Sequence, residues 1–348
     1  MYGFTGKLGG RFALVLSLGT IAVSGCTIAG IVGNGSIKEA MPYSFSTNDP
    51  AMGCASGLAL TNFLMGFSYQ YEKDEIPAPL LKASVVTRLS AGMCAESESH
   101  EAELRRMRAM FNKQPTEAMD AGISEKRLHG LAATRNYDAF QALAGAYGPP
   151  GSNDEDGKLA CPEFDDDYPE ALLYTLGLSS GLLAVVHDTL SGRLVGVAMD
   201  MPPAIMRATS CVDNDAWWGV PDALRSAILL SLPQNDMPID EVWKRLYASA
   251  DKGLAAGMTL PSALLAQSLA SQGKQEELCA LFERIDGLTT PPPAAYQLLD
   301  VYARTLIRHE SNKIWTQEKG HRAELNALAC PPSNTPVIPA TDEDLFGD

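Results

Sequence analysis

Apolar residues recur at helical spacing along most of this 348-residue chain, and this pattern limits its fold more than any other feature. Leu224, Ile228 and Leu229 form one such group, and Val242 and Leu246 another. Residues three and four apart share one face of a helix, whereas strands would need strict alternation, which is scarce here. The sequence therefore predicts an all-α fold over residues 51–330, with little or no β structure.

Proline and capping residues divide this region into helices. Proline favours the first helical turn, where its missing N–H is not needed. Helices are therefore expected to begin at Met237-Pro238, Leu260-Pro261 and Thr290-Pro291. Residues 260–285 predict a helical hairpin that turns at 272–274. Stacked hairpins of this kind build tetratricopeptide-like solenoids, because one pair cannot bury both of its apolar faces. No clean 34-residue period is present, so the expected repeats are degenerate.

Charge excludes one broad class of function. Lys and Arg number 27 against 42 Asp and Glu, which gives a formal net charge of −15. Phosphate backbones are bound by a surplus of Lys and Arg, so nucleic acid is not an expected partner. The length allows one large domain or two ordinary ones, with a sizeable core.

The pattern of the first residues is typical of an export signal. Lys7 and Arg11 precede an uncharged run over residues 12–23, followed by Val23-Ser24-Gly25-Cys26. The apolar run is too short to span a bilayer, which needs about 20 residues. Val-Ser-Gly-Cys resembles the lipobox of bacterial lipoproteins, in which the signal is cut before a cysteine that is then acylated. We therefore expect a signal peptide over 1–25 and lipidation of Cys26; the alternative is a chance cysteine beside an ordinary cleavage site.

The residues around this site set the expected location and the flanking segments. Cleavage before Cys26 would leave 25 Lys and Arg against 42 acids, a net charge of −17. Thr27 follows the cysteine where an Asp tends to retain lipoproteins at the inner membrane, so the resemblance implies the periplasmic face of the outer membrane. Glycine and proline over residues 26–50 predict a flexible tether. Residues 331–348, proline-rich and then acidic, predict a disordered tail.

The remaining six cysteines suit an oxidising compartment, where an even number permits three disulfides. Sequential pairing is expected because each bond would tie neighbouring helices: Cys54 with Cys94, Cys161 with Cys211, and Cys279 with Cys330. Several buried free thiols are the alternative, since Cys is among the most buried residue types.

Two short motifs carry candidate chemistry. Residues 177–181 match G-x-S-x-G, the turn that exposes a nucleophilic serine in hydrolases. They sit within an uncharged stretch, 171–186, that reads as one continuous helix, so close helix packing is the favoured interpretation and no enzyme activity is expected. Residues 152–163 follow a calcium-loop spacing, with Asp154, Asp156 and Glu163 as candidate ligands. A solvated acidic loop is the favoured alternative, because Ser152 replaces the usual first Asp and Pro162 interrupts the exit.

Other cofactor signals are missing from the sequence. The five histidines show no metal-ligand spacing, and no zinc, Rossmann or P-loop signature is present, so no cofactor is expected. Trp217 and Trp218 could line a binding site for an apolar ligand, although aromatic residues at such spacing more often pack in a core.

Several segments together resemble one protein family. They are Ala171-Leu172-Leu173-Tyr174 with the uncharged stretch after it, Asp213 to Pro221, Leu232-Pro233, and Trp243 to Gly253. The pattern is similar to the T component of TRAP transporters, periplasmic lipoproteins with cryptic tetratricopeptide-like helices, over about residues 51–316. Thr175 follows Tyr174 where the family usually has Trp.

The resemblance implies a helical body with an apolar cleft, trimeric assembly, and docking of a periplasmic solute-binding protein. The cleft would pass a hydrophobic small molecule, and its candidate lining comprises Tyr174, Leu178, Leu182, Trp217 and Trp218. A plain core helix over 171–186 is the alternative. For the whole protein the alternative function is a helical adaptor in envelope assembly.

Overall fold

The computed structural model describes residues 31–69, 71–72, 75–165, 169–232, 237–325 and 327–332. Within these ranges the fold is all-α, as predicted, and the only β feature is an isolated bridge between Asn153 and Leu159. The helices are α2 (Met41–Ser46), α3 (Pro50–Ser68), α4 (Ala78–Phe111), α5 (Pro115–Tyr147), α6 (Glu170–Ser191), α7 (Met201–Ala208), α8 (Val220–Ser231), α9 (Ile239–Ala255), α10 (Leu260–Ser271), α11 (Gln275–Asp286) and α12 (Gln297–Lys319). Short π- and 3₁₀-helical segments precede α2 (η1, Ser36–Ala40), follow α7 (η3, Thr209–Cys211) and precede α12 (η4, Ala294–Tyr296).

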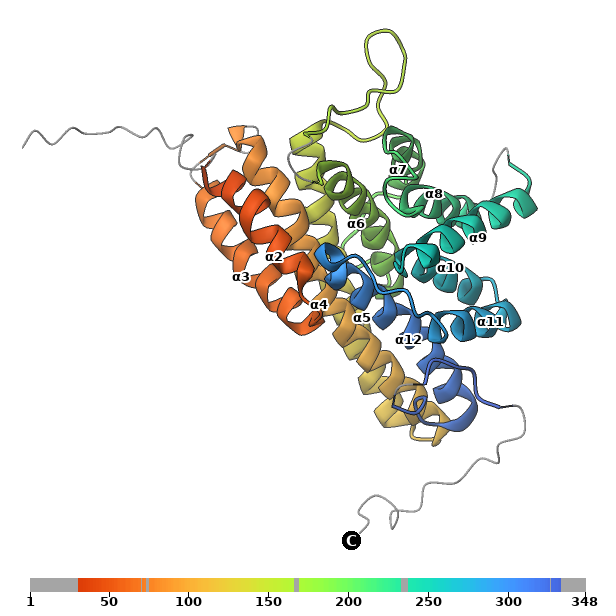
Figure 1. Ribbon diagram of the computed structural model, residues 1–348. Coiled ribbons are helices and arrows are strands. Elements are labelled where there is room, and N and C mark those ends of the chain that lie inside the picture. Colours follow the sequence, from red (N-terminus) through yellow and green to blue (C-terminus); the bar gives the residue numbers. More distant parts are fainter. Residues whose placement is uncertain are drawn as a thin grey trace, which may run out of the picture.

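Neighbouring helices pack in sequence order across the molecule (Figure 1). α4 and α5 form a long antiparallel hairpin, flanked by α3 on one side and α6 on the other. α8 to α11 form the far side, and α12 returns to contact both α4 and α10. Two buried apolar clusters follow this arrangement, one centred on α4, α5 and α6 and the other on α8 to α12.

The observed starts and turns confirm most of the expected helix boundaries. α9 follows Pro238, α10 carries Pro261 in its first turn, and α10 and α11 form the hairpin predicted over 260–285. Gly273 has φ +68° in its turn, a conformation that glycine adopts without steric cost. The start expected at Thr290-Pro291 is wrong, because α12 begins at Gln297. Pro291, Pro292 and Pro293 are consecutive, and a residue before proline is disfavoured in the α conformation.

The segment before α3 also differs from the flexible tether expected over residues 26–50. From residue 31 the described chain is helical, and Met41 and Phe45 are buried in the first core cluster. These two side chains lie four residues apart and therefore on one face of α2. The glycines and prolines of this segment led to the prediction of a tether, whereas part of it forms a short amphipathic helix.

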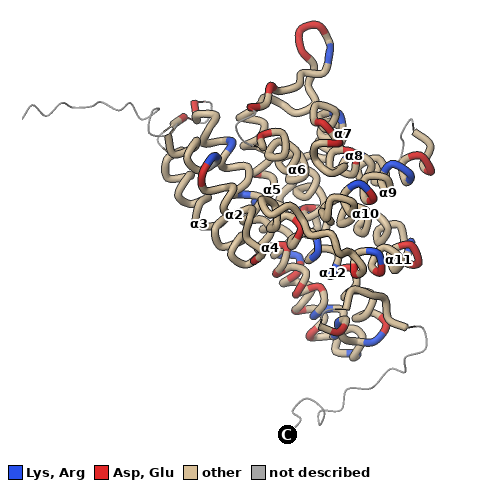
Figure 2. Tube along the Cα trace, viewed as in Figure 1, with Lys and Arg blue, Asp and Glu red and all other residues tan. Residues whose placement is uncertain are grey.

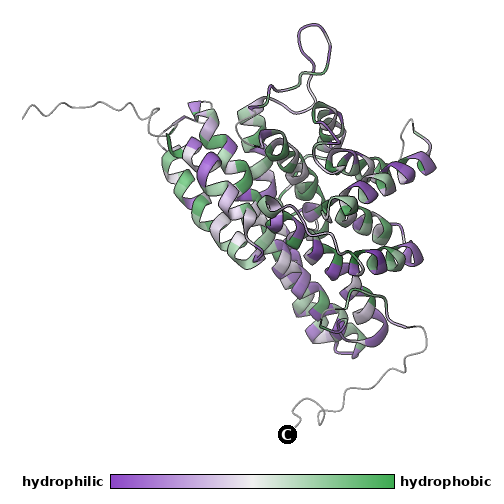
Figure 3. Cartoon of the chain, viewed as in Figure 1, coloured by the Kyte–Doolittle hydropathy of each residue, from purple (hydrophilic) through white to green (hydrophobic). Residues whose placement is uncertain are grey.

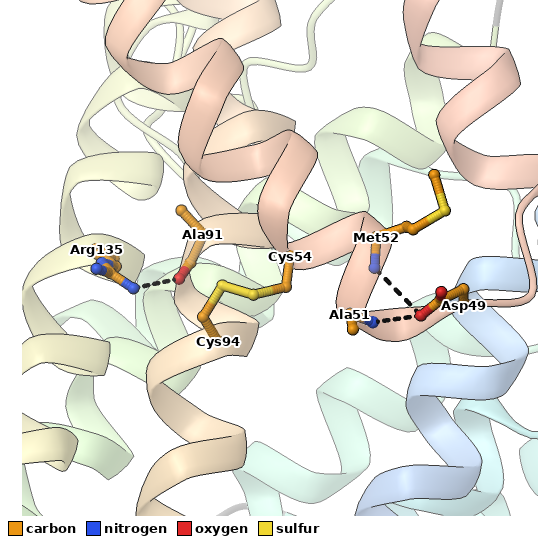
Figure 4. Close-up of a disulfide and its surroundings, with 7 residues drawn as sticks. All are labelled: Asp49, Ala51, Met52, Cys54, Ala91, Cys94 and Arg135. Carbon is orange, nitrogen blue, oxygen red and sulfur yellow. Dashed lines mark hydrogen bonds between the residues drawn. A yellow bond between two sulfur atoms is a disulfide. The ribbon is translucent and has the colours of Figure 1, made fainter.

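All six described cysteines form disulfides in the expected sequential pairs. Their Cα–Cα separations are 5.3 Å for Cys54–Cys94, 5.3 Å for Cys161–Cys211 and 5.5 Å for Cys279–Cys330, within the usual range for a disulfide. The first ties α3 to α4 (Figure 4). The second joins the loop before α6 to the segment after α7, and the third holds the C-terminal segment on α11.

Candidate functional site

Four of the five histidines gather in the interior of the molecule, each from a different helix. His100 lies on α4, His129 on α5, His187 on α6 and His309 on α12. Two carboxylates of α4, Glu96 and Glu103, contact this group. We refer to these six residues together with Tyr302 of α12 as the histidine cluster.

One half of the histidine cluster is a chain of hydrogen bonds that runs across four helices, α12, α4, α6 and α5. The Tyr302 hydroxyl donates to Glu96 Oε2, and His187 Nε2 lies 3.1 Å from Glu96 Oε1. His187 Nδ1 lies 3.0 Å from Nδ1 of His129. When His187 Nε2–H donates to the carboxylate, its Nδ1 can accept the Nδ1–H of His129. Glu96, His129 and His187 are all buried, so each depends on these partners to satisfy its polar atoms.

The other half joins α4 to the middle of α12. His309 Nε2 lies 2.8 Å from Glu103 Oε2, and its ring stacks on that of His100 with centroids 3.7 Å apart. Arg106, one turn after Glu103, approaches that carboxylate and also binds Glu125 of α5. Lys313 pairs with Glu310 one turn after His309.

Burial and pairing hold the acids ionised and two histidines neutral. Burial works to raise the pKa of Glu96, but the hydrogen bonds from His187 and Tyr302 and the nearby histidines lower it to about 2. For Glu103, burial again works upward, while the bond from His309 and the charge of Lys313 lower the pKa to about 2.

The pKa values of two histidines are also lowered, here because burial disfavours the charged form of the ring. Burial and the neighbouring His309 lower the pKa of His100 to about 3, and burial with His187 lowers that of His129 to about 4. Burial also raises the pKa of Tyr302 well above its ordinary value.

The contacts in the histidine cluster are pairwise. Among the residues that the structure describes, no group of three or more His, Cys, Asp or Glu side chains is placed to hold a metal ion. The arrangement joins four helices through charge-assisted bonds. Its burial makes His100 and His129 harder to protonate than they are in an unfolded chain.

A groove with a mixed apolar and charged lining lies beside the histidine cluster between α4, α5 and α6. Its volume is about 410 Å³, and its lining is Arg106, Ala118, Met119, Gly122, Ile123, Glu125, Lys126 and Leu190. Met119, Ile123 and Leu190 are each at least half exposed. Glu125 precedes His129 by one turn of α5, and Leu190 follows His187 by about one turn of α6, so the groove and the histidine cluster share these helices. Exposed apolar side chains beside charged ones are typical of a protein-binding surface.

The structure places the five candidate cleft residues in or against the first core cluster. Tyr174 and Leu178 are buried, and Tyr174 contacts Tyr147 and Phe164. Leu182 is half-buried on the same helix. Trp217 and Trp218 are half-buried too and pack edge-on against each other and against Tyr296. None of the five lines either the groove or a small apolar cavity between α2, α3 and α4.

That apolar cavity is too small for an organic ligand. Its volume is about 30 Å³, and Phe45, Gly57, Leu60, Val86 and Leu298 are among the residues around it. A buried water needs about 10–15 Å³ on this measure, whereas ligand pockets span about 300–1,000 Å³.

The candidate calcium ligands are exposed and lie in the loop between α5 and α6. Asp154 Oδ1 accepts hydrogen bonds from the backbone N–H groups of Asp156 and Lys158, which accounts for the tight turn of the loop. Asp156 and Glu163 join no metal-binding group among the described residues.

The G-x-S-x-G motif lies in the middle of α6. Ser179 Oγ donates to the carbonyl of Leu176, and Ser180 Oγ to that of Gly177. A Cβ on Gly181 would lie 2.5 Å from the ring of Phe140, so this glycine allows close packing of α5 on α6. No strand leads into the motif within the described residues around it, in contrast to the strand-turn-helix that exposes a catalytic serine.

Sequence reasoning missed the histidine cluster because its members come from four helices. One local signal was available, since Glu96, His100 and Glu103 lie four and three residues apart and so share one face of α4. Cys26, the signal peptide expected over residues 1–25 and residues 333–348 of the expected tail lie outside the described residues. Comparisons of the chain with models of known protein families, with curated proteins and with solved structures gave no match.

Proposed function

We propose that this protein is a lipid-anchored, non-enzymatic scaffold on the periplasmic face of a bacterial outer membrane. One observation carries the proposal. Of seven cysteines in the chain, six are joined in disulfides, and the seventh is Cys26 of the Val-Ser-Gly-Cys motif.

Both parts of this observation favour export and acylation. Three disulfides favour an oxidising compartment, because thiols are kept reduced in the cytosol. Pairing of the other six leaves Cys26 without an intramolecular partner, directly after an uncharged run of signal-peptide length. A thiol at this position suits acylation, and two or more acyl chains give a stable anchor.

The scaffold's partner is proposed to be a periplasmic solute-binding protein of a TRAP-type transport system, as the family resemblance implies. The groove between α4, α5 and α6 supports a docking role because its lining combines exposed apolar side chains with Arg106, Glu125 and Lys126. Trimeric assembly and passage of a hydrophobic ligand belong to the same proposal. A ligand would require the core around Tyr174 and Leu178 to open, because both side chains are buried there.

The second candidate is an adaptor in envelope assembly, in which the stacked helices only hold other proteins. The filled core at the candidate cleft positions favours it over ligand transfer.

The anchor is tested by metabolic labelling with a clickable palmitate analogue. The wild-type chain should be labelled and found with the outer membrane, and the Cys26→Ser variant should be unlabelled. Cys54→Ser with Cys94→Ser is the matched control and should keep the label. Equal labelling of the wild type and Cys26→Ser, or none in either, would refute the anchor.

The partner is tested by photo-crosslinking in intact cells. A benzophenone amino acid replaces Ile123 in the groove or, as the control, Ile239 of α9; both side chains are 51% exposed. We expect a solute-binding protein to be captured from position 123 only. Capture of envelope-assembly proteins would favour the adaptor, and equal capture from both positions would exclude the groove as a docking site.

A further inference from the structure

Helix α3 presents an exposed face that is almost entirely apolar. Its 19 residues include no Lys, Arg, Asp or Glu (Figures 2 and 3). Met52, Phe63, Met65 and the C-cap Tyr69 are each about half exposed or more. At 100° per residue, the exposed residues fall on about half of the helix circumference. They are Ala51, Met52, Ala55, Leu58, Ala59, Asn62, Phe63, Met65, Gly66 and Tyr69. Asn62 is the only one of them with a fully polar side chain.

The opposite side of α3 is fixed to the body of the protein. Gly53, Gly57 and Leu64 are buried, and a Cβ on Gly57 would lie 2.6 Å from Cβ of Ser90 and 2.7 Å from the backbone nitrogen of Ala91. The Cys54–Cys94 disulfide adds a covalent tie to α4 (Figure 4). The helix therefore cannot rotate to bury its apolar face, which stays available to a surface outside the described chain.

Length and composition alone would let α3 cross a membrane, as they would α6. α6 is mostly buried inside the protein, whereas most of α3 is not. Because α3 packs on α4 and is joined to it by a disulfide, it could contact a bilayer only by lying along the bilayer surface.

The position of the proposed anchor favours a lipid bilayer as the surface that contacts α3. Cys26 precedes Ile31, the first described residue, by five positions, which an extended chain spans in at most about 18 Å. A Cβ on Gly33 would lie 2.6 Å from the backbone of Pro79, at the start of α4. α3 and α4 are antiparallel neighbours, so this is the end at which α3 finishes with Phe63, Met65 and Tyr69. An acylated Cys26 would thus hold this end of α3 near the lipid headgroups.

We infer that the exposed face of α3 lies in the interface of the bilayer to which the protein is anchored. This inference rests on the proposed lipid anchor. Phe, Met and Tyr side chains suit this boundary, where apolar groups enter the acyl region and the Tyr hydroxyl remains among headgroups. The face carries no cation, and the mature chain would have a net charge of −17. Zwitterionic lipid is therefore the preferred surface, and anionic lipid repels the protein.

Lipid photo-crosslinking of the full lipidated protein tests the inference. Benzoylphenylalanine replaces Phe63 or, as the control, Ile239 of α9, whose exposures are 52% and 51%. Each protein is reconstituted into phosphatidylcholine vesicles and irradiated, and lipid adducts are measured by mass spectrometry. We expect lipid adducts from position 63 and none from position 239. The yield from position 63 should fall when half of the lipid is phosphatidylglycerol.

The outcomes separate the apolar face from the anchor. Palmitate-labelled Cys26 with no adduct from position 63 would refute the bilayer contact and leave the anchor intact. Adducts from position 63 on an unlabelled chain would refute the anchor alone. Crosslinks from position 63 to a second copy, in place of lipid, would identify the face as a self-association surface and overturn the inference. Leu58 lies on the same face and is 37% exposed. Leu58→Glu should reduce the lipid adducts from position 63 without changing the circular dichroism spectrum.

Discussion

His129 and His187 face each other through their Nδ1 atoms at 3.0 Å in the interior of the protein. Such a contact needs one proton and one lone pair, so the two rings can share a single proton but cannot both carry one at these atoms. On the far side of His187, the ionised Glu96 takes a hydrogen bond from Nε2. A second proton on this pair would therefore replace the hydrogen bond between α5 and α6 by repulsion between two charged rings.

Acid should destabilise the fold before the carboxylates titrate. The folded pKa values of His129 and His100, about 4 and 3, lie below the ordinary 6.5, so the unfolded chain takes up these protons first. Their contribution is complete above pH 6.5 and is lost as the pH falls below it, by up to about 1.4 kcal/mol per pH unit for each histidine. Urea unfolding from pH 7.5 to 4.5 measures this slope. His129→Gln should make the slope shallower and His321→Gln, at an exposed site, should not; equal slopes in all three proteins would contradict the assignment.

Removing the charge of Glu96 should weaken the packing of three helices. Glu96→Gln keeps the size of the side chain but leaves His187 and Tyr302 without an ionised acceptor, and breaking a buried pair costs about 3–5 kcal/mol. Glu98→Gln, exposed on the same helix, is the control and should change the unfolding free energy by less than about 0.5 kcal/mol. Chemical denaturation at pH 7.5 measures both. A loss for Glu96→Gln no larger than that of the control would mean that the hydrogen-bond chain contributes little.

Two glycines of α3 should respond in opposite ways to alanine. At Gly57 the new Cβ would meet backbone atoms of Ser90 and Ala91 that cannot move aside, so Gly57→Ala should cost about 1–3 kcal/mol. At Gly66 nothing lies within 4 Å, and Gly66→Ala should stabilise the helix by up to about 1 kcal/mol. Thermal unfolding of the two variants distinguishes a packed helix from a loosely attached one, for which both would be stabilising.

The sequence pattern predicts helices better than it predicts contacts between them. Leu264 and Leu278 belong to apolar stripes on either side of Gly273, and that local information was enough to predict the α10–α11 hairpin. The disulfide pairing followed from the order of the helices, because consecutive helices pack together here. The histidine cluster depends instead on His187 and Glu96, which are 91 residues apart, and no local period records such a contact. The burial of Met41 and Phe45 was missed for a different reason, because the glycines and prolines around them favoured a flexible tether.

Removal of the Cys54–Cys94 disulfide should loosen α3 selectively. In the chain-entropy view a loop of this size stabilises the fold by about 4 kcal/mol, and Cys54→Ser with Cys94→Ser removes that restraint. Hydrogen exchange should become faster over α2 and α3, because α3 is then held only by noncovalent packing, while α10 to α12 stay protected. Cys279→Ser with Cys330→Ser is the converse control, because that bond holds the C-terminal segment on α11. Faster exchange throughout the chain after loss of the first bond would show instead that α3 is part of one cooperative unit, in which case its apolar face is held in place by the whole core and not by this single tie.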